Sequence, residues 1–350
     1  MLVSMWSLFS GRSKDTHRVW RLSSFHITEV ARHSMDAVEQ HDAFFNSFNL
    51  VRGPCLGSGA LGEVVLASAK HNSSLKVAVK IVPFETEECE SDFLSEVGFL
   101  RDLRHPCILK MIAFAMDDHY GFMLSTYFKN GTLRDTMSSD PPVKEPRILR
   151  HILDVASALQ YIHGLHIFHQ DVKPRNILLD DQDRAVLADF GLARQASDSS
   201  AMVMKWETTP GYYGPETRKS RPMSPFKVRI SSFFFISFLC TSLPPNLHCS
   251  ALMFNVTLIL IQYLPAVKDL LFLDMYSLGV SMWMLIYRQR SEGIKDLLAF
   301  SDQCKDVKEP YRRILRQLLR KDPNKRWSAA DLLRFCVWNS LCAPSLMSSH

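Results

Sequence analysis

The first part of the chain carries the hydrophobic pattern of β-strands. From Leu50 onward, short runs rich in β-branched and other apolar residues predict strands over 50–66, 75–82, 108–115 and 121–128. A helix is predicted between them over 92–103, because apolar residues at 93, 97, 100 and 103 recur at helical spacing.

The second part of the chain is helical. The clearest helix is predicted over 146–164, where Gly164 gives a stop signal. Its apolar stripe consists of Ile148, Ile152, Val155, Leu159 and Ile162. Another stripe lies within 311–319, and Ser328 followed by Asp331 predicts a capping box at the start of the last helix. The order of the elements therefore indicates an α+β protein with its sheet first.

One stretch departs from both patterns. Residues 230–267 contain no Asp, Glu, Lys or Arg, and Pro244-Pro245 divides them into apolar runs at 233–243 and 251–267. A membrane helix needs about 20 apolar residues to span the hydrocarbon core, so the first run is too short and the second is marginal. We therefore favour an insertion or a translated intron over a membrane hairpin, which stays open as the alternative.

Composition narrows the classes of function. The 350 residues carry a formal charge of +5, and no long basic run supports nucleic-acid binding. The eight cysteines are scattered without a Cys-x-x-Cys pair, which indicates free thiols in a reducing compartment. We expect a cytoplasmic protein, with membrane association through 230–267 as the alternative.

The chemistry concentrates between Ile167 and Gly191. His169-Gln170-Asp171-Val172-Lys173-Pro174-Arg175-Asn176 is followed, after a short apolar run, by Asp189-Phe190-Gly191. Two carboxylates, one lysine and one amide at this spacing suit phosphoryl transfer, which requires an aimed hydroxyl and neutralised phosphate charge. Oxygen ligands such as Asp189 and Asn176 suit magnesium.

This stretch resembles the eukaryotic protein kinase family, with H-x-D-x-K-x-x-N as its catalytic loop and D-F-G as its metal-binding turn. The resemblance implies that Asp171 orients the acceptor hydroxyl and accepts its proton, and that Lys173 neutralises phosphate. It implies that Asn176 and Asp189 hold Mg²⁺ beside bound ATP.

A glycine-rich hairpin is expected to cover the nucleotide phosphates. Gly57, Gly59 and Gly62 form G-x-G-x-x-G-x-V with Val64, and the β-branched residues that follow favour a strand hairpin over a dinucleotide-binding turn, which leads into a helix. Glycines there let backbone N–H groups approach phosphates without a Cβ in the way.

The resemblance supplies the rest of the nucleotide site. Lys80 ends an apolar strand and is expected to contact the phosphates and to pair with Glu96 on the helix over 92–103. The other expected nucleotide contacts are Leu56, Val64, Ala78, Ser125, Thr126, Tyr127, Phe128 and Leu178. Ser125 stands at the gatekeeper position, and Thr126, Tyr127 and Phe128 are expected to offer backbone groups to adenine.

One departure concerns regulation. The family usually has Arg between the His and the Asp of the catalytic loop, whereas this chain has Gln170. A phosphate on Ser197, Ser199, Ser200 or Thr208 would lack that bidentate partner. Lys173 in the catalytic loop, together with Thr209, favours serine/threonine over tyrosine specificity.

The resemblance covers about 50–340 less the insertion, and it implies a bilobal α+β fold. We expect a small antiparallel-sheet N-lobe with one main helix and a larger, mostly helical C-lobe. We predict a kinase domain over 49–340, with an N-lobe at 49–128, a C-lobe at 129–340 and a tail at 341–350. Residues 1–48 carry no motif and are expected to form a disordered or regulatory extension, although their Arg12, Lys14, Arg18 and Arg21 leave a mitochondrial transit peptide open.

The family pattern also bounds the insertion. When 229–273 are removed, Val228 joins Asp274 in the family's uninterrupted run into its central helix, whose leading aspartate holds the catalytic loop. Glu216 is expected to pair with Arg326.

The function expected from the resemblance is an ATP- and Mg²⁺-dependent serine/threonine protein kinase that acts on protein substrates as a monomer. The alternative is a pseudokinase or scaffold that binds nucleotide and partners without efficient catalysis.

Overall fold

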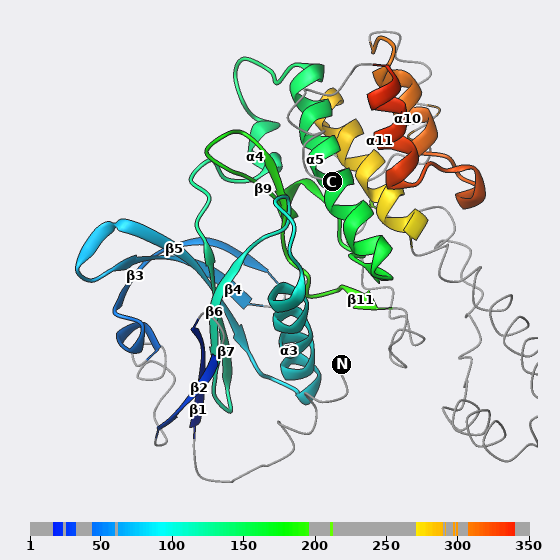
Figure 1. Ribbon diagram of the computed structural model, residues 1–350. Coiled ribbons are helices and arrows are strands. Elements are labelled where there is room, and N and C mark those ends of the chain that lie inside the picture. The colour runs from blue at the N-terminus through cyan, green and yellow to red at the C-terminus, as the bar shows by residue number, and fades with distance from the viewer. Residues whose placement is uncertain are drawn as a thin grey trace, which may run out of the picture. The chain divides into compact units, whose positions relative to one another are not determined.

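The computed structural model describes residues 17–23, 26–32, 44–59, 62–195, 211–212, 271–289, 291, 297, 299 and 307–339. The chain divides into two compact units (Figure 1). Unit 1 comprises Met1–Arg104 and Leu109–Phe128, and unit 2 comprises His105–Ile108 and Lys129–His350.

Unit 1 is built on a five-stranded antiparallel sheet. Its strands are β3 (Leu50–Gly59), β4 (Gly62–Ala69), β5 (Asn72–Pro83), β6 (Met111–Met116) and β7 (Tyr120–Thr126), in the order β3-β4-β5-β7-β6. A separate hairpin pairs β1 (His17–Ser23) with β2 (His26–Arg32). All four predicted strand regions are confirmed.

The core on one face of this sheet begins earlier than the predicted domain start at 49. Phe44 and Phe45 are buried together with Val79, Ile81 and other residues of β4 to β7. The Phe44 ring stacks on Phe122 with 4.3 Å between centroids. Residues 44–48 are therefore part of unit 1, because removing them would expose the core that the sheet alone cannot cover.

Helix α3 (Glu87–Asp102) packs against the sheet of unit 1. It begins earlier than the predicted 92–103, because the side chain of Thr86 caps it by accepting a hydrogen bond from the backbone N–H of Cys89. Phe93, Val97 and Leu100, three of the predicted apolar positions, are buried. The amphipathic prediction for this helix is confirmed.

Unit 2 is mainly helical. Its helices are α4 (Leu133–Thr136), α5 (Glu145–Gly164), α10 (Tyr311–Leu318) and α11 (Ala329–Trp338), and residues 271–287 form a further helix. Its short strands are β8 (Ile167–Phe168), β9 (Ile177–Leu179), β10 (Ala185–Leu187) and β11 (Arg194–Gln195), with 3₁₀ turns at Pro174–Asn176 and Pro323–Lys325.

Helix α5 is the centre of unit 2. Its predicted stripe from Ile148 to Ile162 is fully buried, and the helix lies beside the yellow helix of residues 271–287 and near α11 (Figure 1). The predicted capping box of α11 is also present: Asp331 N–H donates to Ser328 Oγ at 3.2 Å, and Ser328 N–H donates to Asp331 Oδ2 at 3.0 Å.

These findings confirm the fold-class prediction of an antiparallel-sheet unit with one main helix and a larger helical unit. The last residues of the predicted insertion at 229–273 are described. Residues 271–273 are the first turn of the helix that carries Asp274, and Leu273 is buried. The insertion itself stays a prediction. The stretch 213–270 lies outside the described residues. Within the described part, no helix is both long and apolar enough to cross a bilayer.

Candidate active site

The catalytic-loop residues meet within unit 2. A 3₁₀ turn at Pro174–Asn176 folds the chain back after Val172, whose side chain is buried. Lys173 Nζ then donates to Asp171 Oδ2 at 2.7 Å, and Asn176 Nδ2 donates to the same oxygen at 2.9 Å and to the Asp171 carbonyl at 3.0 Å. The Asp171 carboxylate is buried and is held in one orientation by a cation and an amide.

His169 fixes the backbone of the loop. Its Nδ1 accepts a hydrogen bond from the backbone N–H of Asp171 at 3.2 Å, so the ring proton of the neutral imidazole lies on Nε2. Nε2 then donates to the Ala188 carbonyl at 3.0 Å, and the ring meets Phe190 edge-on at 4.8 Å between centroids. The histidine thereby joins the catalytic loop to the Asp189-Phe190-Gly191 turn.

The buried carboxylate of Asp274 holds the backbone of the catalytic loop. Asp274 has no exposed surface. It accepts the N–H of His169 at 2.9 Å and the N–H of Gln170 at 2.7 Å. The predicted role of Asp274 is confirmed by these two bonds, which help to hold Gln170 at a φ of 63°.

The two expected magnesium ligands lie on neighbouring backbone segments. The Ala188 N–H donates to the Asn176 carbonyl at 2.9 Å, which brings Asp189 next to Asn176, and Asp189 adopts a φ of 64°. Because Asn176 Nδ2 donates to Asp171, its amide oxygen is the atom left to act as a ligand. One amide and one carboxylate oxygen fit Mg²⁺, which keeps waters and takes further oxygens from nucleotide phosphates.

Within the described ranges, no group of three or more His, Cys, Asp or Glu side chains is arranged to hold a metal ion. The histidines near α5 instead make hydrogen bonds to protein groups. His151 contacts Asp183, His163 contacts Asp274, and His169 contacts Ala188.

In unit 1, Lys80 forms the ion pair expected from its sequence context. Its Nζ lies 2.8 Å from Glu96 Oε2 and 3.1 Å from Oε1, which joins β5 to α3. Glu96 is 3% exposed, so its charge depends on this partner.

The sheet register places several expected nucleotide contacts on one face. Val64 pairs with Lys80, Leu66 with Ala78, and Ala78 with Ser125. Since alternate residues point to opposite faces, these side chains lie opposite to Val65 and Val79, which fill the Phe44 core. Val64 and Ala78 are half-buried, as residues that leave room for a ligand would be.

The glycine-rich hairpin is formed by β3 and β4, with Gly59 opposite Gly62. Gly62 has a φ of 120°, and a Cβ there would lie 2.0 Å from the Ile81 carbonyl oxygen. Among the described residues, no atom lies within 4 Å of a Cβ added at Gly57 or Gly59. The hairpin itself therefore requires a glycine only at Gly62. The space beside Gly57 and Gly59 would let a phosphate group come close to the backbone.

The remaining expected nucleotide contacts lie in both units. Leu56 is exposed in β3, Thr126 ends β7, and Tyr127 and Phe128 follow it. Leu178 lies in β9 of unit 2, where it is half-buried and forms a bridge with Thr132.

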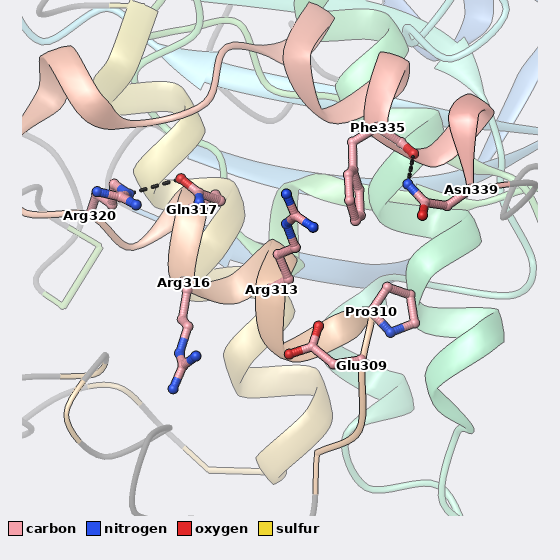
Figure 2. Close-up of a pocket in the computed structure, with 8 residues that line it drawn as sticks. All are labelled: Glu309, Pro310, Arg313, Arg316, Gln317, Arg320, Phe335 and Asn339. Atoms are coloured by element: carbon pink, nitrogen blue, oxygen red, sulfur yellow. Dashed lines mark hydrogen bonds between the residues drawn. The ribbon is translucent and has the colours of Figure 1, made fainter.

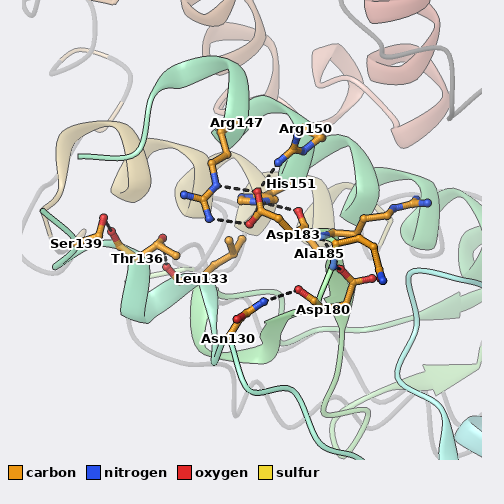
Figure 3. Close-up of polar contacts among 12 residues, drawn as sticks. Asn130, Leu133, Thr136, Ser139, Arg147, Arg150, His151, Asp180, Asp183 and Ala185 are labelled. Carbon is orange, nitrogen blue, oxygen red and sulfur yellow. Dashed lines mark hydrogen bonds and ion pairs between the residues drawn. The ribbon is translucent and has the colours of Figure 1, made fainter. Parts of the chain in front are cut away.

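The turn between β9 and β10 is tied to α5. Arg147, Arg150 and His151 of α5 converge on Asp183 of this turn (Figure 3). Arg147 donates to Asp183 at 2.7 and 2.8 Å. Burial alone would raise the pKa of Asp183, but the bond from Arg147 and the neighbouring positive charges outweigh it and lower the pKa. Burial is the largest cause of the lowered pKa of His151.

A second anchor of the same hairpin is a buried carboxylate that the sequence analysis missed. Asp154 accepts the N–H of Ala185 at 3.0 Å and a bond from Arg184 Nη2 at 3.0 Å. Cys107 lies against this pair, and burial raises the pKa of its thiol to about 12, which makes it unreactive. Cys55 and Cys89 also carry free thiols.

His163 is a further residue near the site that sequence reasoning did not assign. Its Nε2 lies 2.9 Å from Asp274 Oδ2. The feature of the sequence that could have identified His163 is its position at the end of the buried stripe of α5, shortly before the catalytic loop. A polar side chain at such a place needs a buried partner, and the sequence does not identify one 111 residues away.

Some expected residues lie outside the described part. These are Ser197, Ser199, Ser200, Thr208, Thr209 and Glu216, so the Glu216–Arg326 pair stays a prediction. Arg326 itself is buried and donates to the carbonyl oxygens of Arg320 and Phe272.

Comparison with known proteins gives a family. The sequence model of the protein kinase domain matches residues 50–231, and this match ends where the apolar stretch begins. A probable receptor-like protein kinase of Arabidopsis thaliana is 36% identical over 49% of this chain and 26% of its own length. LIM domain kinase 1 of Drosophila melanogaster is 31% identical over 55% of this chain and 15% of its own.

A third relative aligns over more of the chain. Serine/threonine-protein kinase Sgk1 of Rattus norvegicus is 26% identical over 79% of this chain and 56% of its own length. The chain thus spans between 15% and 56% of the length of these relatives.

Proposed function

The chain belongs to the protein kinase family, and from this premise we propose that it transfers the γ-phosphate of ATP to serine and threonine hydroxyls of proteins. The observation that carries this proposal is the fixed Asp171 carboxylate, to which Lys173 and Asn176 both donate.

Asp171 acts on the acceptor hydroxyl. Its carboxylate orients the hydroxyl oxygen toward the γ-phosphorus and accepts the proton as the oxygen–phosphorus bond forms. The amide and the ammonium hold the carboxylate still, so little reorganisation is needed when substrate arrives. Lys173 also brings positive charge to the site where the phosphate charge develops.

In unit 1, the glycine-rich hairpin and β5 supply the proposed phosphate contacts. Lys80, held by Glu96, contacts the phosphates, while the backbone of Gly57 and Gly59 lies against them without interference from side chains. Ala78 and Val64 are the proposed adenine contacts of unit 1, and Leu178 is the proposed adenine contact of unit 2. Asn176 and Asp189 would hold Mg²⁺, which when bound would neutralise phosphate charge.

Serine/threonine specificity is the finer part of the proposal. Lys173 is of the serine/threonine type within Asp-Val-Lys-Pro-Arg-Asn, and a relative that aligns over 79% of this chain is named a serine/threonine-protein kinase. The scattered free cysteines support a cytoplasmic setting for the enzyme, with membrane association through 230–267 as the alternative.

The proposal is tested by incubating the purified chain with γ-labelled ATP, Mg²⁺ and a mixed protein substrate. Acid hydrolysis of the labelled product should release phosphoserine and phosphothreonine. Phosphotyrosine as the main product would overturn the specificity. If the chain binds nucleotide but transfers no phosphate, the alternative function of a pseudokinase would take the place of this proposal.

A further inference from the structure

A groove with basic walls lies between α10 and α11, within unit 2 and apart from the catalytic loop. It has a volume of about 550 Å³. Its lining consists of Glu309, Pro310, Arg313, Arg316, Gln317, Arg320, Phe335 and Asn339 (Figure 2). Three guanidinium groups and one carboxylate line it, so the groove favours a negatively charged occupant.

Two of the guanidinium groups are held in place by neighbours. The Arg313 guanidinium lies over the Phe335 ring at 5.0 Å from its centroid. Arg320 Nε donates to Gln317 Oε1 at 2.8 Å. A guanidinium that is already oriented loses less conformational freedom when it binds a carboxylate, which favours binding.

The arginines are spread along the groove. Arg313, Arg316 and Arg320 recur at intervals of three and four residues, so they follow one side of the segment over about 10 Å. Figure 2 shows the guanidinium groups of Arg313 and Arg316 pointing in different directions. A single phosphate needs converging donors, whereas the carboxylates of an extended peptide are spread along its length, as these arginines are along the groove.

Apolar groups complete the surface. Pro310 and Phe335 line the groove. Helix α11, which carries Phe335, ends with Val337 and Trp338, and these side chains are 46% and 89% exposed. Within the groove, Phe335 and the guanidinium of Arg313 lie together, and aromatic and guanidinium groups are the kinds that provide most of the affinity in protein-binding surfaces.

We propose that the groove between α10 and α11 is a docking site for an extended acidic peptide segment of a protein partner, with carboxylates on Arg313, Arg316 and Arg320 and an apolar residue on Phe335. Docking there does not require catalysis. It would hold a substrate or regulator on the kinase independently of the nucleotide.

The test measures binding of a defined probe to the full chain by fluorescence anisotropy, without nucleotide. The probe is a fluorescein-labelled peptide with Glu at alternate positions followed by two Leu residues. Neutralising all three arginines (Arg313→Gln, Arg316→Gln and Arg320→Gln) should weaken binding at least about tenfold, since three ion pairs of modest strength are lost.

A matched control removes the same number of charges outside the groove lining. Lys321→Gln, Lys325→Gln and Arg334→Gln together should leave probe binding within about twofold of the parent. Arg316 is exposed, so the single variant Arg316→Gln keeps the test valid if the triple variant unfolds, and it should weaken binding about two- to threefold.

Several outcomes would overturn the proposal. These are no probe binding by the parent, equal weakening in the control, or equal binding of a probe with Gln in place of Glu. Self-association of the chain that disappears in the triple variant would assign the groove to a second copy, and tighter binding of a monophosphorylated peptide without acidic residues would assign it to phosphate.

Discussion

At the scale of single residues, the catalytic loop depends on side chains that do not themselves touch substrate. Asp274 takes two backbone N–H groups of the loop and lies 2.9 Å from His163 Nε2. His163 Nδ1 is buried and has no hydrogen-bond partner among the residues that the structure describes. Because a carboxylate oxygen accepts, His163 Nε2 donates this hydrogen bond to Asp274.

Replacing His163 should therefore loosen the loop. We expect His163→Asn to lower the free energy of unfolding by about 1.5–3 kcal/mol, the cost of losing a hydrogen bond to a buried charge. We also expect kcat to fall while the KM for ATP stays nearly unchanged, because the anchor serves the loop rather than the nucleotide site of unit 1. Thermal unfolding and steady-state kinetics measure both.

The control is His166→Asn, because His166 is exposed and has a φ of 58°, which Asn tolerates. This variant should match the parent in both measurements. Equal effects in the two variants would show that the bond to Asp274 does not position the loop.

At the scale of elements, the glycine-rich hairpin separates two roles that its sequence motif combines. Gly62 lies against β5, where an added Cβ would meet the Ile81 carbonyl oxygen, while Gly57 and Gly59 face open space. The motif G-x-G-x-x-G alone treats the three glycines as equivalent. Only the fold indicates which one the hairpin itself needs.

Substitutions in the hairpin should divide accordingly. Gly62→Ala should destabilise the protein by about 1–3 kcal/mol or more, because of its φ and the backbone clash. Gly57→Ala and Gly59→Ala should change stability by less than about 0.5 kcal/mol, yet they should weaken ATP binding, since a methyl group would enter the space for phosphate. Thermal unfolding and nucleotide titration would contradict this account if Gly57→Ala lowered stability as much as Gly62→Ala.

Elements were predictable where periodicity or a cap marks them. The buried stripe of α5 and the capping box at Ser328 and Asp331 were read from the sequence. The Phe44 to Phe48 segment was missed, because one turn of helix is too short to show a period, and its burial depends on strands as distant as β7. The start of α3 was placed late, since its first turn is acidic and exposed, and only the Thr86 cap marks it.

At the scale of the site, the sequence predicted which residues form the catalytic loop but not which hydrogen-bond partners hold that loop in place. Asp171, Lys173 and Asn176 lie within six positions, so a local turn suffices to bring them together. The partners of Asp274 and Asp154 come from distant parts of the chain, and pairings of that kind depend on the packing of α5 against the rest of unit 2.

At the scale of the whole molecule, buried histidines make stability depend on pH. His151 and His105 both have lowered pKa values, in each case chiefly because burial penalises the charged ring. In the unfolded chain they titrate near about 6.5. Below that pH the unfolded state binds protons that the folded state does not, so the free energy of unfolding should fall as the pH drops from about 7.5 to about 5.5.

Chemical denaturation across this range measures the effect. His151→Gln removes one of the two groups and should flatten the slope. A free energy of unfolding that rises on acidification, or a variant with the parent's slope, would contradict the assignment. At lower pH the loss continues as the pH approaches the lowered pKa of Asp183, because protonation then removes its bonds with Arg147 and Arg150.

The central claim is that the fixed carboxylate of Asp171 performs the chemistry. The most direct measurement compares phosphate transfer and ATP affinity in the parent and in Asp171→Asn. The amide keeps the size of the side chain but cannot accept the hydroxyl proton, so transfer should fall by about 10²-fold or more while the Kd for ATP changes little. Equal rates of phosphate transfer by the two proteins would contradict the account.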